Sequence, residues 1–432
     1  MLNRIHIRGY KSLLDVEVEL RPLTVLFGPN AAGKSNFLDA LQLLSHTATS
    51  RTLKEAFEPP YRGKPLESFS FGERGLKQLL EQESARFSIE VDVELAPAVV
   101  AGVNAQIREM RKGKTPEDGT AKKPAVHVRE RNLRYRIEIE ILPKSGILRV
   151  SDEYLAALTT KGTTTKSRRP FVERVGNRIH LRMEGQAHPI YHDRYLDHSI
   201  LSLPVYPPHY PHLVAMRQEL SRYFFFYFEP RERMRAPNPV KEVRHIGFMG
   251  EELAAFLNTL RTLDPRQFRA VEKSLHMIVP SVTGIHVDVN AMGEVDLLLR
   301  EGELEVPARV VSEGTLRVLG LLALSGAKDP PALVGFEEPE NGVHPGRVRM
   351  IADLLRTRAA TGESQLIVTT HSPILPDLIP DDSLFVCRKD TRQTAISPFR
   401  TWGPLGRRKD IDEALDESLT PSQRIMRGDF DA

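Results

Sequence analysis

Residues 28–35 read GPNAAGKS, and this stretch constrains the fold of the chain more than any other. It matches the pattern G-x-x-x-x-G-K-S. An apolar run over residues 23–27 precedes it, and residues 36–44 carry apolar side chains at helical spacing. A strand, a glycine loop and a helix in this order can turn backbone N–H groups towards a phosphate, and the helix start adds partial positive charge. We therefore predict a phosphate-binding loop.

The side chains of this loop predict how a nucleotide is held. Lys34 should reach the β- and γ-phosphates, and the Ser35 hydroxyl should sit on Mg²⁺. The predicted binding residues of the loop are Gly28, Pro29, Asn30, Ala31, Ala32, Gly33, Lys34, Ser35 and Asn36.

Length, charge and cysteine content narrow the class of protein. A chain of 432 residues is long enough for two or three domains and a sizeable core. Its net charge of +3 is nearly balanced and indicates no class of partner. One cysteine, Cys387, provides no disulfide framework, which suits a reducing cytosol. No signal-peptide pattern and no apolar stretch near ~18 residues is visible, so we expect a cytoplasmic protein that does not cross a membrane.

Hydrophobic periodicity predicts further elements. Alternation predicts strands over residues 87–95 and 178–183, and helical spacing predicts helices over residues 251–260 and 265–278. The polar residues 151–170 are expected to form a solvent-exposed segment that leaves the folded core. No heptad with apolar a and d positions persists between Ala101 and Pro280, so we expect no long coiled coil there. A hairpin is predicted from residues 285–289 and 295–299.

The middle of the chain contains a basic stretch over residues 105–136, with ten lysines or arginines against four acids, and residues 113–124 within it read as a loop. A solvated face is one interpretation, and a contact surface for the phosphates of a nucleic acid is the other. Its basic residues are Arg108, Arg111, Lys112, Lys114, Lys122, Lys123, Arg129, Arg131, Arg134 and Arg136.

Two other features of the middle region have two interpretations each. Five histidines between residues 188 and 212 suggest either a metal site or structural side chains, and their spacing matches no ligand pattern, so we favour the structural role. The aromatic run 223–228 suggests either a strand buried on both faces or a base-stacking platform, and we favour the buried strand. The five histidines are His188, His192, His198, His209 and His212.

Three more motifs follow in the second half of the chain. Ser312 and Gly314 open a helical run, so they either cap the helix or offer an anion-binding start. Glu337 and Glu338 end an apolar strand, where one carboxylate can hold Mg²⁺ and the other can orient or deprotonate a water molecule. His371 follows the strand 365–369 and could reach a γ-phosphate, although a lone histidine there is usually structural.

In this order, the phosphate loop, the SEGT segment, the EEPEN segment and the THSP segment resemble the ATP-binding-cassette ATPase heads of the SMC/RecF/OLD group. Among these the chain is most similar to stand-alone prokaryotic AAA/SMC-type predicted ATPases. The resemblance covers roughly residues 1–100 and 245–390. It implies an α/β P-loop fold with a mixed sheet, an antiparallel β lobe and a helical signature lobe, joined to an α+β insertion.

The resemblance also implies a composite site in a head-to-tail homodimer that traps two ATP molecules with Mg²⁺. Glu337 takes the magnesium-side Walker B place, Glu338 that of the catalytic carboxylate, and His371 that of the switch histidine. Lys34 completes the implied catalytic set. Residues 341–344 correspond to the D-loop. Further nucleotide contacts are implied for Lys11 and Ser12 and, from the other subunit, for Ser312 and Gly314.

The implied function is an ATP-gated ATPase that works in DNA repair or in defence against foreign DNA. The alternative is a regulatory ATP switch that gates a separate effector, such as a nuclease, without binding DNA. Two departures from the family pattern stand out: Glu337 replaces the usual aspartate, and the residues after His371 lack the acids of a TOPRIM nuclease domain. The expected domains are residues 1–100 and 246–390 as ATPase lobes, 101–245 as the insertion and 391–432 as a tail.

Overall fold

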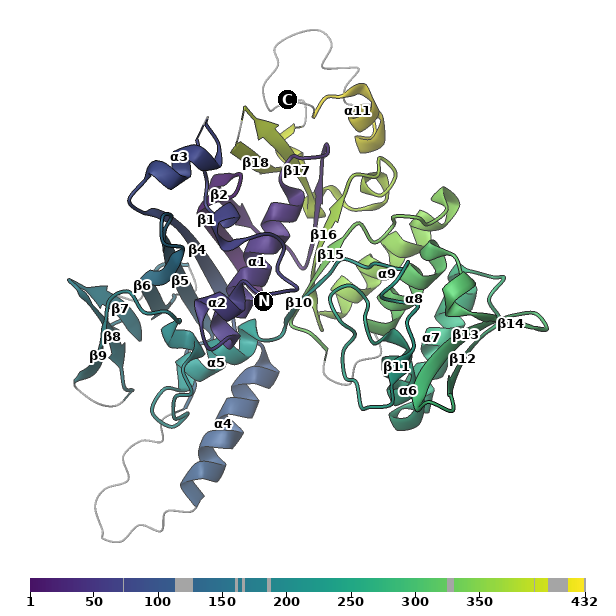
Figure 1. Ribbon diagram of the computed structural model, residues 1–432, viewed down its shortest axis with the longest axis horizontal. Helices are drawn as coiled ribbons and strands as arrows, with labels where there is room; N and C mark the ends of the chain where they lie inside the picture. The colour runs from purple at the N-terminus through teal and green to yellow at the C-terminus, as the bar shows by residue number, and fades with distance from the viewer. Residues whose placement is uncertain are drawn as a thin grey trace.

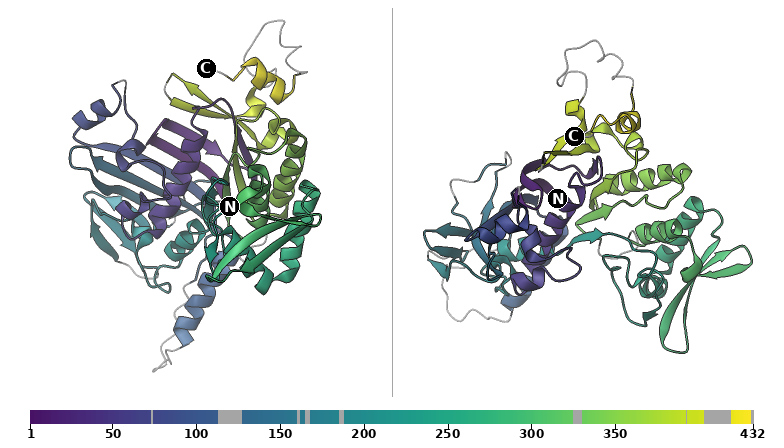
Figure 2. Two further views of the ribbon diagram at one scale, coloured as in Figure 1. Left: turned by 45° about the vertical axis from the view of Figure 1, so that its right-hand side comes forward. Right: turned by 45° about the horizontal axis from the view of Figure 1, so that its top comes forward.

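A computed structural model describes residues 1–72, 74–112, 127–159, 162–164, 168–184, 188–324, 330–391, 393–402 and 419–430. These residues form three β-sheets with helices packed on and between them (Figure 1; Figure 2). The predicted α/β class is confirmed, with a mixed sheet that carries the phosphate loop, an antiparallel β lobe and a helical lobe.

The antiparallel lobe is an eight-stranded sheet with the order β2-β1-β4-β5-β6-β7-β8-β9. Its strands alternate, so that side chains such as Ile89 and Ile137 are fully buried while their neighbours are partly exposed. The predicted boundary at residue 100 remains a prediction, and β4 and β5 on its two sides pair directly. The strands are β1 (Leu2–Tyr10), β2 (Leu13–Glu19), β4 (Ala85–Glu94), β5 (Asn132–Leu142), β6 (Ile147–Ala157), β7 (Val172–Val175), β8 (Arg178–Arg182) and β9 (Pro189–Asp193).

One expectation for this lobe is wrong. Residues 151–157 do not belong to a solvent-exposed segment, because they form the second half of β6. Their polar side chains are buried with partners: Ser151 donates to Glu138, and Glu153 accepts from Tyr135. Hydrogen bonds made to distant residues let a polar sequence occupy an inner strand.

The central sheet has the order β10-β15-β16-β3-β17-β18, and all neighbouring strands are parallel except β17 and β18. Its strands are apolar because both faces are covered. Leu26 of β3 enters the core shared with the antiparallel lobe, whereas Val25 and Phe27 enter the core of the helical lobe. The strands are β3 (Leu23–Phe27), β10 (Tyr223–Phe226), β15 (Leu333–Glu337), β16 (Gln365–Thr370), β17 (Leu384–Asp390) and β18 (Gln393–Pro398).

The aromatic run is a buried strand only in its first part. Tyr223, Phe225 and Phe226 are buried in β10, but Tyr227 is 37% exposed beyond the end of the strand. There its backbone N–H bonds to Phe248 instead of to a neighbouring strand of the sheet.

The helical lobe covers the other face of the central sheet. The helices predicted over residues 251–260 and 265–278 and the predicted hairpin are confirmed as α6, α7 and the pair β12–β13. Its elements are α6 (Leu253–Leu263), α7 (Pro265–Ile278), α8 (Glu313–Ala323), α9 (Val348–Thr361), β11 (Asn238–Pro239), β12 (Gly284–Val289), β13 (Glu294–Glu301) and β14 (Leu304–Pro307).

The remaining helices lie on or beside the first lobe and at the C-terminal end. Helix α1 packs between the antiparallel lobe and the central sheet, and α4 extends away from the body (Figure 1). No helix among the described residues is both long and apolar enough to cross a membrane. These helices are α1 (Lys34–Thr49), α2 (Leu53–Ala56), α3 (Leu76–Glu81), α4 (Pro97–Lys112), α5 (Pro211–Leu220) and α11 (Pro421–Arg427).

The side chain of Glu153 is the most deeply buried acid of β6. Its Oε2 accepts a hydrogen bond from the Ile200 N–H at 2.6 Å, and its Oε1 accepts from the Leu201 N–H at 3.1 Å and from the Tyr135 hydroxyl at 2.9 Å. Burial nevertheless dominates and raises the pKa of Glu153 to about 7.

We predict that Glu153 makes the protein less stable as the pH rises from 4.5 to 7. The folded protein keeps a proton on this carboxyl that the unfolded chain, with a pKa near 4.5, has lost. The free energy of unfolding should therefore fall across this window by about 3 kcal/mol and then level off. Urea unfolding at a series of pH values measures this fall in the free energy of unfolding.

Glu153→Gln removes the titrating group and should abolish this part of the pH dependence. Glu303→Gln, on an exposed turn, should keep the wild-type dependence. An unchanged pH slope in Glu153→Gln would contradict the prediction.

Candidate nucleotide-binding site

The phosphate loop leaves β3 at Phe27 and enters α1 at Lys34. Gly28 has φ +148° and Gly33 has φ +102°. A Cβ on Gly28 would overlap the carbonyl oxygen of Cys387 in β17. Glycine is therefore required at Gly28 by the neighbouring strand as well as by the backbone conformation.

A chain of hydrogen bonds fixes the loop from one side. Thr394 Oγ1 donates to the Ala32 carbonyl oxygen at 2.8 Å and lies 2.7 Å from Ser12 Oγ. Asn36 Nδ2 donates to Ser12 Oγ at 2.7 Å. The structure thus brings Ser12 and Asn36 together beside the loop, and their contact with a nucleotide stays a prediction. Thr394 was not predicted, since nothing in the local sequence of β18 links it to a loop so far away in the chain.

Lys34 is folded back over its own loop. Its Nζ donates to the carbonyl oxygens of Gly28 at 2.7 Å and of Pro29 at 2.8 Å. Burial lowers the pKa of Lys34, and the nearby carboxylates oppose this shift. The ammonium group is therefore already desolvated, and a phosphate would replace carbonyl oxygens as its partner.

The two residues predicted to hold Mg²⁺ are in direct contact. The Ser35 hydroxyl donates to Glu337 Oε1, at the place where β15 ends beside the start of α1. A hydroxyl and a carboxylate oxygen are the hard donors that Mg²⁺ prefers, so these residues fit the ion.

Sequence reasoning missed the arginine that lies at this place. Arg62 Nη1 is 2.8 Å from Glu337 Oε2, and Arg62 Nη2 is 2.7 Å from Asp39 Oδ1. Lys11, which the resemblance places at the nucleotide, pairs with the other oxygen of Asp39 at 2.7 Å. Because Arg62 lies in a stretch of mixed loop signals, no periodicity in the sequence points to it.

The residues predicted for hydrolysis also meet. His371 Nδ1 lies 2.7 Å from Glu338 Oε1. Glu338 has φ +51°, and its N–H donates to the Thr369 carbonyl oxygen at 2.9 Å. The parallel pairing of β15 with β16 brings the two motifs to the same edge of the sheet.

Ser312 and Gly314 lie at the start of α8. Ser312 Oγ accepts from the Thr315 N–H at 3.2 Å and so caps the helix. A Cβ on Gly314 would overlap the carbonyl oxygen of Gly342, so the signature segment packs closely on the predicted D-loop of the same chain.

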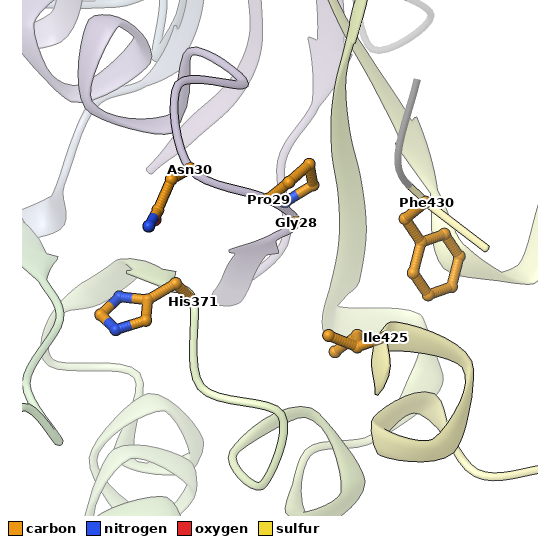
Figure 3. Close-up of a pocket in the computed structure, with 6 residues that line it drawn as sticks. All are labelled: Gly28, Pro29, Asn30, His371, Ile425 and Phe430. Atoms are coloured by element: carbon orange, nitrogen blue, oxygen red, sulfur yellow. The ribbon is translucent and has the colours of Figure 1, made fainter. Parts of the chain in front are cut away.

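A cavity of about 200 Å³ lies beside the phosphate loop (Figure 3). Asn30 and His371 face it from one side, while Ile425 and Phe430 close it from the other. Phe430 packs edge-on against Phe27, with ring centroids 5.3 Å apart. The C-terminal residues were predicted only as a tail. The lining residues are Gly28, Pro29, Asn30, His371, Ile425 and Phe430.

Two family models match the chain. The model described as "AAA ATPase domain" matches residues 1–152, and the model described as "AAA domain, putative AbiEii toxin, Type IV TA system" matches residues 203–377. An OLD nuclease of Thermus scotoductus is 24% identical over 403 residues, which cover 92% of this chain and 64% of the relative. The DNA replication and repair protein RecF of Synechocystis sp. is 31% identical over 93 residues, 21% of this chain and 22% of the relative.

The fold has a solved counterpart. The crystal structure of the SmcHead bound to the C-winged helix domain of ScpA aligns with a TM-score of 0.51 and 12% identity, covering 92% of this chain and 96% of that one. The two family models and the curated relatives together support an ATPase of the SMC/RecF/OLD type. ATPases of this type bind a nucleotide. The chain spans less than two thirds of the length of each curated relative named here.

The basic stretch contains both paired arginines and exposed ones. Arg134 pairs with Asp92 at 2.6 Å and Arg136 with Asp152 at 2.8 Å, so both are engaged on the antiparallel sheet. Arg108 and Arg111 are exposed on α4. Residues 113–126, which include the whole of the loop predicted over residues 113–124, lie outside the described residues.

Of the five histidines between residues 188 and 212, His212 has a structural role. Buried His212 lies 2.7 Å from Glu184 through Nδ1, and its Nε2 accepts from the backbone N–H groups of Arg129 and Glu130. Within the parts of the chain that the structure covers, no three potential ligands gather in a way that could hold a metal ion.

We predict that Gly28→Ala destabilises the protein by about 3 kcal/mol or more and abolishes nucleotide binding, because the added carbon overlaps the Cys387 carbonyl. Gly302→Ala is the matched control, since Gly302 also has positive φ but would meet nothing within 4 Å. It should lose only about 1 kcal/mol. Thermal unfolding and binding of a fluorescent ATP analogue measure both effects, and equal losses would contradict the steric explanation.

Proposed function

We propose that the chain binds ATP with Mg²⁺ at residues 28–35 and hydrolyses it to ADP and phosphate. The observation that carries this proposal is the contact between Glu338 and His371, 2.7 Å apart at the sheet edge where Ser35 meets Glu337. A carboxylate beside a magnesium-type pair is the arrangement that orients or deprotonates an attacking water.

Each group has a distinct role in this proposal. The N–H groups of the loop and the Lys34 ammonium hold the phosphates, and Ser35 and Glu337 hold the metal. Bound Mg²⁺ would neutralise charge on the β- and γ-phosphate oxygens. Glu338 takes the proton of the attacking water, while His371 orients Glu338 and faces the cavity next to Asn30.

We further propose that the ATP site is completed by a second copy of the chain, as the resemblance implies. Ser312 and Gly314 pack on the D-loop turn, and the cavity beside the phosphate loop is lined by other residues. A signature segment from the partner is therefore consistent with this arrangement. ATP trapped between two copies stabilises the dimer only until it is hydrolysed.

Glu338→Gln should lower the rate of phosphate release at least about a hundredfold while ATP still binds, because the amide cannot take a proton. On size-exclusion chromatography with ATP and Mg²⁺ the variant should run as a stable dimer. Glu303→Gln, an exposed acid-to-amide control, should match the wild type. Wild-type hydrolysis by Glu338→Gln would show that another group is the base, and no effect of ATP on size would contradict the dimer.

The biological output is proposed to involve DNA. The relatives named above are an OLD nuclease and a DNA replication and repair protein, and two exposed arginines, Arg108 and Arg111, lie on the projecting α4. Repair of DNA and defence against foreign DNA are the candidate pathways. The alternative is a switch that gates a separate effector, such as a nuclease, with no DNA contact of its own.

We predict that the double variant Arg108→Glu/Arg111→Glu binds duplex DNA at least about tenfold more weakly and with a salt slope reduced by about 2, because each arginine contact releases roughly one counterion. Arg266→Glu/Arg269→Glu on α7 makes the same charge change at another exposed helix and should bind like the wild type. Fluorescence anisotropy in a salt titration measures both. No difference between the two variants would favour the effector-gating alternative.

A further inference from the structure

Glu340 is a third acid of the EEPEN segment, and the mechanism above does not use it. Its side chain is only 6% exposed. Oε1 accepts a hydrogen bond from the Thr370 hydroxyl, and Oε2 is buried without a hydrogen-bond partner among the described residues. Burial raises the pKa of Glu340. A buried acid with one unsatisfied oxygen destabilises the fold, so its presence here calls for a reason other than stability.

Thr370 connects this acid to the switch histidine. It is the last residue of β16 and directly precedes His371. Its Oγ1 also accepts from the Ser372 N–H at 2.9 Å, so the hydroxyl holds the backbone directly after His371. The orientation of the imidazole towards Glu338 therefore depends on a hydroxyl that is itself fixed by Glu340.

Glu340 also begins the turn that reaches the signature helix. Its carbonyl oxygen accepts from the Val343 N–H at 3.0 Å, and Gly342 within this turn has φ +73°. Gly342 lies in close contact with Gly314 at the start of α8. Glu340 thus links the two regions, because its side chain bonds to Thr370 beside His371 and its main chain bonds to the turn that packs on the signature segment.

We propose that the Glu340–Thr370 hydrogen bond is a positioning contact that keeps the Glu338–His371 pair and the D-loop turn in a fixed relation. The inference rests on the proposed ATPase function. Neither residue touches the nucleotide in this proposal, and both act through His371 and the 341–344 turn. Loss of the bond should slow hydrolysis without weakening ATP binding, because the phosphate loop does not depend on it.

The test compares Thr370→Val, which removes the hydroxyl at nearly constant shape, with Thr370→Ser, which restores it. Thr370→Val should lower kcat about tenfold and leave KM and the Kd for ATP within about twofold of wild type. Thr370→Ser should behave like the wild type. Glu340→Leu should reproduce the Thr370→Val defect, and the double variant should be no slower than either single variant, since both remove the same bond.

A second measurement does not require hydrolysis. Hydrogen exchange of the nucleotide-free protein should be about tenfold faster in Thr370→Val for the amides of Ser372 and residues 341–344, and unchanged in Thr370→Ser. Unchanged exchange in Thr370→Val, full activity of that variant, or an equal loss of ATP affinity would overturn the inference. If the wild type itself does not hydrolyse ATP, the proposed function fails instead, and the exchange rates still decide whether the link exists.

Discussion

The arrangement of the site depends on the parallel pairing of β16 between β15 and β3. Glu337 is paired with Thr369, and Thr369 is paired with Leu26, so the three strands end at the same level of the sheet. The phosphate loop follows β3, Glu338 follows Glu337 at the end of β15, and His371 follows β16. Backbone hydrogen bonds between segments far apart in sequence therefore bring together residues that carry the proposed chemistry.

Part of the fold and site could be predicted because the signals are local. Glycines, a helix start and apolar runs identify the phosphate loop and the strands on either side, and the ordered motifs identify the predicted site residues. Arg62, Thr394 and Phe430 could not be predicted, since each reaches the site through packing between distant segments. The buried polar half of β6 was misread for the same reason: Glu153 is satisfied by N–H groups of Ile200 and Leu201, which no periodicity reveals.

Three cationic side chains of the site already have partners in the structure without a nucleotide. Lys11 and Arg62 share Asp39, Arg62 extends to Glu337, and Lys34 is held by carbonyl oxygens. A nucleotide with its metal would therefore exchange partners of groups that are already desolvated. Such exchange favours affinity because the groups need little further ordering or loss of water when the ligand binds.

The pairing of Leu23 with Leu366 has a consequence for how the protein is made. A ribosome completes the phosphate loop long before it makes the strands on both sides of β3, which are β16 (Gln365–Thr370) and β17 (Leu384–Asp390). Until then β3 lacks both strands with which it pairs in the sheet. This high contact order predicts slow folding and a nascent chain that depends on chaperones or on the early antiparallel sheet for protection from aggregation.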